Sequence, residues 1–195
     1  MRTQLRIVAG SLRGRRLSCH LGPHLRPMPD MVRQAMFSIL GDAIPGRPFY
    51  DLFAGSGAVG LEALSRGAEP VYFVERDPRT AGQIAVHLRA FGVEERAHVQ
   101  RSDVYRWVER WQPPAEAVTI FLGPPYRDFE ERLDALVRVL ADLQLKAAKG
   151  SVLVLQADHD APRRESLPDA AHWEERVYGR NRLLFWVKET MATQP

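Results

Sequence analysis

Apolar positions between residues 29 and 158 alternate between a helical period and short continuous runs. The segment 29–40 has apolar residues at helical spacing, with Asp30 placed to cap it and Gly41 to end it. The other predicted helices are 60–67, 78–92, 103–111 and 128–145. The short apolar runs predict strands at 47–55, 70–77, 97–103, 117–123 and 150–158. Strands that alternate with helices in this way indicate a parallel sheet with helices on both faces.

The pattern changes at both ends of the chain. Residues 172–179 and 181–189 read as two strands joined by a short polar turn, which predicts an antiparallel edge pair. Residues 5–10 and 15–21 cluster apolar positions around Ser11–Gly14, as a short hairpin does. We therefore expect an α/β protein with a Rossmann-like, mostly parallel seven-stranded sheet in residues 45–195. Residues 1–44 form a hairpin and helix extension.

Composition bounds the class of protein. The chain has 195 residues, of which 45% are hydrophobic and 26% charged, as in ordinary globular domains. No apolar run approaches the roughly 20 residues that cross a bilayer, so no membrane partner is expected. The single cysteine, Cys19, excludes an internal disulfide and fits a reducing cytoplasm. The N-terminus carries no apolar signal-peptide core, and the six histidines show no metal spacing.

Charge is unevenly distributed, although the net charge is only +3. Residues 1–29 contain six arginines and no acid. A basic arm on a nearly neutral body suggests a polyanionic partner, nucleic acid before membrane, and the alternative is a solvated tail. The best candidates for phosphate contacts are Arg13, Arg15 and Arg16, beside Gly14.

The segment DLFAGSGAVGLEAL, residues 51–64, predicts a nucleotide-binding loop. A strand that ends at Asp51 leads into a glycine-rich turn and then a helix, whose N-terminus offers free N–H groups. The glycines also fit G-x-G-x-x-G, so an NAD-dependent oxidoreductase is an alternative, as is a glycine-rich turn without a ligand. Asp51 favours S-adenosylmethionine (SAM), because it would repel a pyrophosphate and pair with an ammonium group.

Two further acids follow the next two predicted strands. Glu75 can accept hydrogen bonds from ribose hydroxyls, a role that NAD and SAM sites share. Asp103 can receive an adenine amino group or cap a helix. The segment 51–57 resembles motif I of class I methyltransferases, which implies SAM as cofactor and S-adenosylhomocysteine as product. The predicted cofactor-binding residues are Asp51, Phe53, Ala54, Gly55, Ser56, Gly57, Glu75, Arg76, Asp103 and Val104.

The stretch FLGPPY, residues 121–126, resembles the (Asp/Asn)-Pro-Pro-(Tyr/Phe) signature of enzymes that methylate exocyclic amines of nucleobases. Its catalytic candidates are Gly123, Pro124, Pro125 and Tyr126. In that family the aromatic residue stacks on the base, and the first side chain accepts a hydrogen bond from the amine. Gly123 cannot do this, and Asp128 is a candidate substitute. The alternative is a rigid strand-to-helix turn.

The N-terminal half makes the resemblance specific. RIVAGSLRGRRL at 6–17 and LRPMPDMVRQAMFSIL at 25–40 resemble the opening of the RsmD family, bacterial 16S rRNA guanine-N2 methyltransferases. The resemblance implies a monomer that methylates N2 of a guanine in 16S rRNA within a small-subunit or assembly particle. Met28, Gln34 and Gly123 depart from the family pattern, so the alternative is a catalytically weakened relative that binds SAM and RNA. The predicted RNA-binding residues are Arg6, Arg13, Arg15, Arg16, Arg26 and Arg33.

Overall fold

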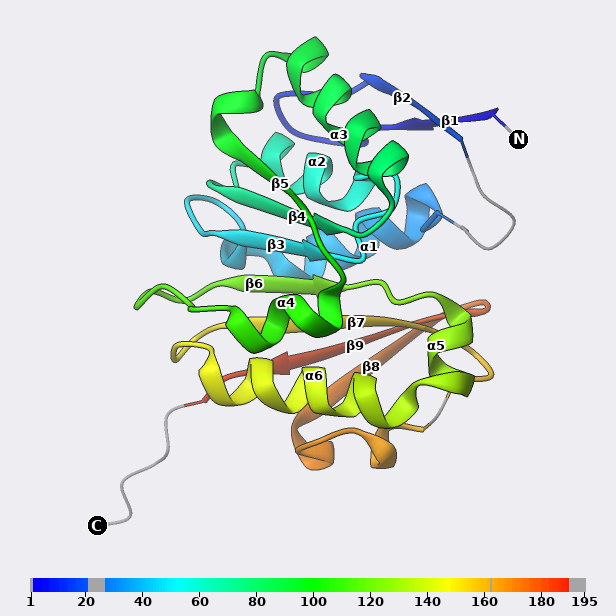
Figure 1. Ribbon diagram of the computed structural model, residues 1–195, viewed down its shortest axis with the longest axis vertical. Coiled ribbons are helices and arrows are strands. Elements are labelled where there is room, and N and C mark those ends of the chain that lie inside the picture. The colour runs from blue at the N-terminus through cyan, green and yellow to red at the C-terminus, as the bar shows by residue number, and fades with distance from the viewer. Residues whose placement is uncertain (1, 21–26, 162, 190–195) are drawn as a thin grey trace.

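The computed structural model describes residues 2–20, 27–161 and 163–189. A seven-stranded sheet has the strand order β5-β4-β3-β6-β7-β9-β8 (Figure 1). The strands are β3 (Phe49–Leu52), β4 (Val71–Glu75), β5 (Ala97–Arg101), β6 (Thr119–Leu122), β7 (Val152–Asp158), β8 (Trp173–Tyr178) and β9 (Asn181–Val187). The first five run parallel, and β9 is antiparallel to both β7 and β8. The predicted Rossmann-like sheet with an antiparallel C-terminal pair is confirmed.

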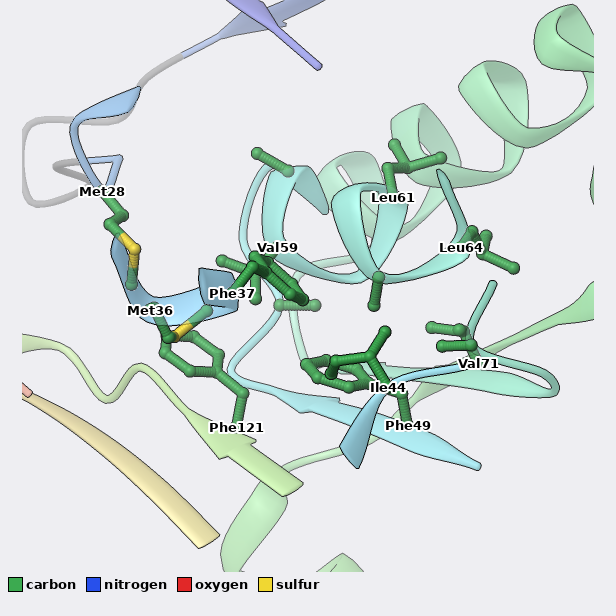
Figure 2. Close-up of a cluster of buried hydrophobic side chains, with 14 of the residues drawn as sticks. Met28, Met36, Phe37, Ile44, Phe49, Val59, Leu61, Leu64, Val71 and Phe121 are labelled. Atoms are coloured by element: carbon green, nitrogen blue, oxygen red, sulfur yellow. The ribbon is translucent and has the colours of Figure 1, made fainter. Parts of the chain in front are cut away.

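Side chains that alternate along the strands divide the core into two layers. The layer that we call the α1 face contains apolar residues of α1 (Asp30–Leu40), α2 (Ala58–Ser65) and α3 (Pro78–Phe91). The opposite layer, the α4 face, contains those of α4 (Val104–Arg110), α5 (Tyr126–Glu131) and α6 (Leu133–Lys146). Phe49 and Phe121 enter the α1 face, while their neighbours Tyr50 and Leu122 enter the α4 face. Figure 2 shows Phe49 and Phe121 with Met36 and Phe37 of α1.

The N-terminal extension forms the predicted hairpin, β1 (Arg2–Arg6) and β2 (Arg16–His20), in antiparallel register. It lies next to α3 (Figure 1). Its residues Ile7, Leu12 and Leu17 are buried and belong to the α1 face. The boundary at residue 44 therefore does not divide the hydrophobic core, and the division into two parts stays a prediction.

Two local predictions are wrong. Asp30 is the first residue of α1 and not its cap: Pro29 takes the cap position, and the Asp30 carboxylate pairs with Arg33 at 2.8 Å. The predicted helix 128–145 is two helices, α5 and α6. They meet at Arg132, whose φ of −135° is not helical. The Arg132 guanidinium lies 3.7 Å from the centre of the Tyr105 ring, so a contact with α4 fixes the residue at the break.

Several smaller features complete the described structure. Short 3-10 turns occur at Gly41–Ala43, Glu94–Arg96, Arg164–Ser166 and Ala170–His172. In the described ranges, no helix has the length and apolar character that crossing a membrane requires. No group of three or more His, Cys, Asp or Glu side chains in those ranges is arranged to hold a metal ion.

Candidate functional site

The candidate site lies at the carboxyl edge of the parallel strands, where β3 and β6 are neighbours. The chain reverses its direction of winding at this pair, since β4 and β5 lie on one side of β3 and β7 on the other. Open α/β sheets place ligands at such a switch point. The loop after β3 and the loop after β6 start side by side there, because the Gly123 N–H donates at 3.2 Å to the carbonyl of Leu52, the last residue of β3. The topology thus brings together the two motifs that the sequence singles out.

The glycine-rich loop depends on backbone conformations that favour glycine. Gly55 and Gly57 have φ values of 52° and 73°, and α2 begins directly after Gly57. Phe53 also has a positive φ, 61°, which is uncommon for a residue with a side chain. Such strain clusters at ligand sites, where the surrounding structure holds it in place. Gly60 serves packing, because a Cβ there would lie 2.3 Å from Cε1 of Phe73.

Asp51 is the last residue but one of β3, just before this loop, and it is almost completely buried. Its Oδ2 accepts a hydrogen bond from the Gly60 N–H at 2.8 Å, which ties the strand to the first turn of α2. Burial raises the pKa of Asp51 to about 8, helped by the charge of Glu75 and opposed by the Gly60 hydrogen bond. At neutral pH the Asp51 carboxyl is therefore protonated in the ligand-free protein, and the hydrogen bond that it accepts from the Gly60 N–H fixes the loop. A contact with an ammonium group of the ligand stays a prediction.

Glu75, at the end of β4, also holds the loop. Its Oε2 accepts from the Gly55 N–H at 2.9 Å, and its Oε1 accepts from the Asp77 N–H at 2.8 Å. A carboxylate has about four acceptor positions, so these two bonds leave room for hydroxyl groups of a ligand. Arg76 is exposed beside it.

Asp103 follows β5 and caps α4: its Oδ1 accepts from the Tyr105 N–H at 3.0 Å. The capping interpretation is therefore confirmed, and a contact with adenine stays open. Arg132 lies 4.0 Å from the Asp103 carboxylate. The Tyr105 hydroxyl donates to Asp128 Oδ2 at 2.6 Å. Burial, and then the bond to Asp128, raises the pKa of the Tyr105 phenol. These contacts connect the end of β5 to the helix that follows the proline loop.

The proline loop leads from β6 directly into α5. Pro124 is buried, Pro125 takes the cap position of α5, and Tyr126 is its first residue. The Asp128 N–H donates to the Pro125 carbonyl at 2.8 Å, which closes the first turn. Tyr126 is half-buried at the candidate site. Asp128 does not fit the role of a substitute acid, because its carboxylate is buried and bound to Tyr105, which packs on the α4 face.

A side chain at position 123 would point into the α1 face of the sheet. A Cβ placed on Gly123 would lie 3.0 Å from Cε1 of Phe121 and 3.9 Å from Oε1 of Gln156. The missing side chain would therefore project toward the amide group of Gln156, on the neighbouring strand β7.

The N-terminal hairpin is anchored to α2 by buried polar groups. The Glu62 side chain is fully buried and accepts from the N–H groups of Val8 at 2.8 Å and Ala9 at 3.0 Å. It also pairs with Arg66 at 2.9 Å and Arg33 at 3.5 Å. Ser65 Oγ accepts from the Leu12 N–H at 2.9 Å and donates to the Ala9 carbonyl. This network fixes the hairpin relative to the glycine-rich loop at the start of α2.

The predicted RNA-binding arginines divide into three groups. The side chains of Arg6, Arg13, Arg15 and Arg16 are exposed. Arg33 is fully buried and bound to Glu62, Asp30 and the Arg6 carbonyl, so a phosphate contact at Arg33 does not fit the structure. A buried guanidinium with these partners holds the fold together. Arg26 lies outside the described residues.

Several residues of the site escaped sequence reasoning, namely Glu62, Ser65, Tyr105, Arg132 and Gln156. Glu62 had a detectable signal, because it is a charged residue inside the otherwise apolar helix GLEALS. Tyr105, Arg132 and Gln156 gave none, since each depends on a partner far away in sequence.

A family model described as "Conserved hypothetical protein 95" matches residues 5–187. "Putative rRNA methyltransferase YlbH" of Bacillus subtilis is 32% identical over 176 residues, covering 90% of this chain and 94% of that protein. "Ribosomal RNA small subunit methyltransferase D" of Escherichia coli is 37% identical over 124 residues, covering 64% of this chain but only 61% of that protein.

Solved structures agree with the fold. "Putative methyltransferase yhhF" from Escherichia coli superposes with a TM-score of 0.75 at 27% identity, covering 96% of this chain and 99% of that one. The Thermus thermophilus 16S rRNA N2 G1207 methyltransferase RsmC, solved with AdoMet and guanosine, gives a TM-score of 0.73 at 21% identity. This superposition covers 97% of this chain and 50% of that one. At this level of identity the likeness shows only that the two proteins share a fold.

Proposed function

This chain belongs to the family described as conserved hypothetical protein 95, which is the RsmD family of rRNA methyltransferases, and we propose that it methylates the exocyclic N2 of a guanine in 16S rRNA. The methyl donor is SAM. The observation that carries the proposal is that β3 and β6 end side by side: the Gly123 N–H, at the start of the proline loop, donates to the carbonyl of Leu52, the last residue of β3 before the cofactor loop. A base held by one loop is then next to a methyl group held by the other.

The residues present fit SAM by their chemistry. Acids stand at the ends of β3, β4 and β5, where an ammonium, ribose hydroxyls and an adenine amine find acceptors. Asp51, Glu75 and Asp103 would hold these three parts, and Phe53 to Gly57 would line the amino-acid end. Arg76 and Val104 would flank the ribose and the adenine. SAM supplies an electrophilic methyl group on a sulfonium.

The chain's own contribution is mainly positioning. Tyr126 would stack on the target base, and Pro124 and Pro125 lack N–H groups that could compete for an acceptor. The Pro125 carbonyl accepts from the Asp128 N–H, so the Pro124 carbonyl is the one proposed to accept from the amine. The three acids at the strand ends would hold SAM as the source of the methyl group, and N2, oriented by the proline loop, would accept it and give up a proton to water. Effective molarities of well-oriented reactants reach about 10⁵ M or more, so orientation alone supplies a large part of the rate.

The exposed arginines of the hairpin would grip phosphates of the rRNA. Arg6, Arg13, Arg15 and Arg16 lie on a hairpin that Glu62 and Ser65 fix to α2, so a gripped RNA is held at a set position relative to the site. We propose that the chain works as a cytoplasmic monomer on a small-subunit or assembly particle. The comparisons give no support to a catalytically weakened relative, and membership of a methyltransferase family does not fit an NAD-dependent oxidoreductase.

The test is transfer of tritium from methyl-labelled SAM to small-subunit particles that lack the modification. We expect label on N2 of one guanine, identified by mass spectrometry of nuclease digests, and a thermal shift with SAM but not with NAD. A ligand at about 100 times its Kd adds about 2.7 kcal/mol of stability. SAM binding without label at N2 would contradict the proposed reaction.

A further inference from the structure

The amine-methylation signature calls for a side-chain acceptor at position 123, and this chain has glycine there. The signature accepts Asn as well as Asp, so a neutral amide oxygen suffices to orient the amine. Any replacement must therefore present an amide or carboxylate oxygen to the space that the missing side chain leaves.

Gln156 meets this requirement by its place in the sheet. In the parallel pair of β6 and β7, Leu122 is aligned with Leu155, so Gln156 lies beside Gly123. Phe121 and Val154, two residues earlier on each strand, both enter the α1 face. Since side chains alternate along a strand, position 123 and Gln156 face the same way. The Gln156 Oε1 atom is 3.9 Å from where a Cβ of residue 123 would be.

Asn181 orients this amide. The Gln156 Nε2 donates to Asn181 Oδ1 at 3.2 Å, which leaves Oε1 as the end that points toward Gly123. Asn181 begins β9 at the same edge of the sheet. Gln156 is half-buried, and the bond to Asn181 holds its amide.

Asp128 and an acid introduced at position 123 are the two alternatives to Gln156 as the acceptor at the proline loop, and neither fits as well. Asp128 is bound to Tyr105 on the α4 side. An aspartate at position 123 would require the Phe121 ring, whose Cε1 lies 3.0 Å from the Cβ position, to shift by a few tenths of an ångström. Phe121 belongs to the same buried cluster as Met36 (Figure 2). Gly123 leaves a space beside Phe121, and Gln156 presents an amide oxygen to that space, where the family signature has the oxygen of an Asp or Asn side chain.

We propose that Gln156 is the catalytic acceptor for the exocyclic amine, replacing the side chain absent from Gly123, with Asn181 as its positioning residue. The proposal rests on the proposed function and names a residue for the same site. Oε1 accepts one N2 hydrogen and directs the nitrogen lone pair at the methyl group. A neutral amide does not hold the proton that N2 loses after methyl transfer, so that proton passes to water.

The first test compares two near-isosteric variants in the tritium assay. Gln156→Met removes the oxygen and keeps the volume, so we expect kcat to fall about 5- to 30-fold, the effect of one lost hydrogen bond. SAM binding and the KM for the particle should stay within about twofold. Gln156→Glu restores an oxygen and should recover the loss. Gln144→Met, at another hydrogen-bonded and more deeply buried glutamine, is the control and should keep wild-type kcat.

A pH series adds a readout that a structural role would not change. In Gln156→Glu the ionised carboxylate can also take the proton that N2 loses, so the ratio of its kcat to the wild-type kcat should fall as the carboxyl is protonated, between about pH 6 and about pH 4. A constant ratio contradicts direct contact with the amine.

The second test concerns Asn181. Asn181→Leu should lower kcat by releasing the Gln156 amide, and Asn181→Asp, which keeps the acceptor, should restore it. If Asn181 acts only through Gln156, the double variant with Gln156→Met should have the same kcat as Gln156→Met alone. Additive losses would overturn the positioning role.

The outcomes separate the two proposals. Wild-type kcat in a folded Gln156→Met variant overturns the role of Gln156 and leaves the proposed methylation intact. Absence of N2 label in the wild-type protein overturns both.

Discussion

At the scale of single residues, buried polar groups decide how the site is held. Asp51 keeps its proton in the folded, ligand-free protein, because burial raises its pKa from 3.8 to about 8. In the unfolded chain the same carboxyl ionises near its ordinary value. The folded state therefore binds more protons than the unfolded state between these two values. The contribution of Asp51 to stability is fully present at low pH and is lost as pH rises through about 8.

Asp51→Asn is expected to remove this pH dependence while it keeps an oxygen for the Gly60 N–H. The free energy of unfolding of the wild type should fall by up to roughly 1.4 kcal/mol per pH unit more than that of the variant, between about pH 5 and 7. Urea unfolding of both proteins at several pH values measures the difference, and other titrating groups cancel in it. Equal slopes would contradict a protonated Asp51.

Gly60 shows why the loop needs its third glycine. A methyl group there would meet Phe73 Cε1 at 2.3 Å, so α2 must move away from β4 in Gly60→Ala. We expect a loss of roughly 1–3 kcal/mol in the free energy of unfolding, the usual cost of overpacking. Gly82→Ala is the matched control, because it lies in α3 with nothing within 4 Å of its Cβ position. The control should gain stability by roughly 0.5–1 kcal/mol, and a similar gain at Gly60 would contradict the packing role.

At the scale of elements, the hairpin and α2 form one unit through Glu62. Glu62→Ala leaves the Arg33 guanidinium buried beside an empty space and frees the N–H groups of Val8 and Ala9. Removing one partner from a buried ion pair costs about 3–5 kcal/mol. We expect this loss in chemical unfolding and faster proteolytic cleavage within residues 7–15. Glu131→Ala, which removes an exposed pair with Arg127, is the control and should behave as the wild type.

The elements also show what the sequence can and cannot predict. Strands and helices of the parallel sheet follow from apolar runs and glycine or proline signals, as at Pro78 and Gly92, which begin and end α3. The break at Arg132 and the pairing of Asp30 with Arg33 depend on tertiary contacts, which local patterns do not contain. The same limit applies to the site. The loops at 51–57 and 123–126 are visible as motifs, whereas Gln156 is placed beside Gly123 only by the strand order.

At the scale of the whole molecule, the hairpin with the exposed arginines and the glycine-rich loop are joined through α2. The hairpin lies beside α3 and is fixed to α2, whose first turn forms part of the glycine-rich loop (Figure 1). The RNA contacts proposed for the hairpin therefore involve other residues than those proposed to bind the cofactor. Phosphate contacts release counterions, so they make binding depend on salt.

Replacing Arg13, Arg15 and Arg16 with Gln should accordingly weaken RNA binding and reduce its salt dependence together. With about 0.7–0.9 ions released per contact, the slope of log Kd against log salt should fall by roughly 2–3. SAM binding should be unchanged, and saturating RNA should restore kcat. Gln replacements at the exposed Arg106, Arg110 and Arg138, on α4 and α6, provide a control with the same loss of charge. Equal effects of the two triple variants would mean that net charge, and not the hairpin, attracts the RNA.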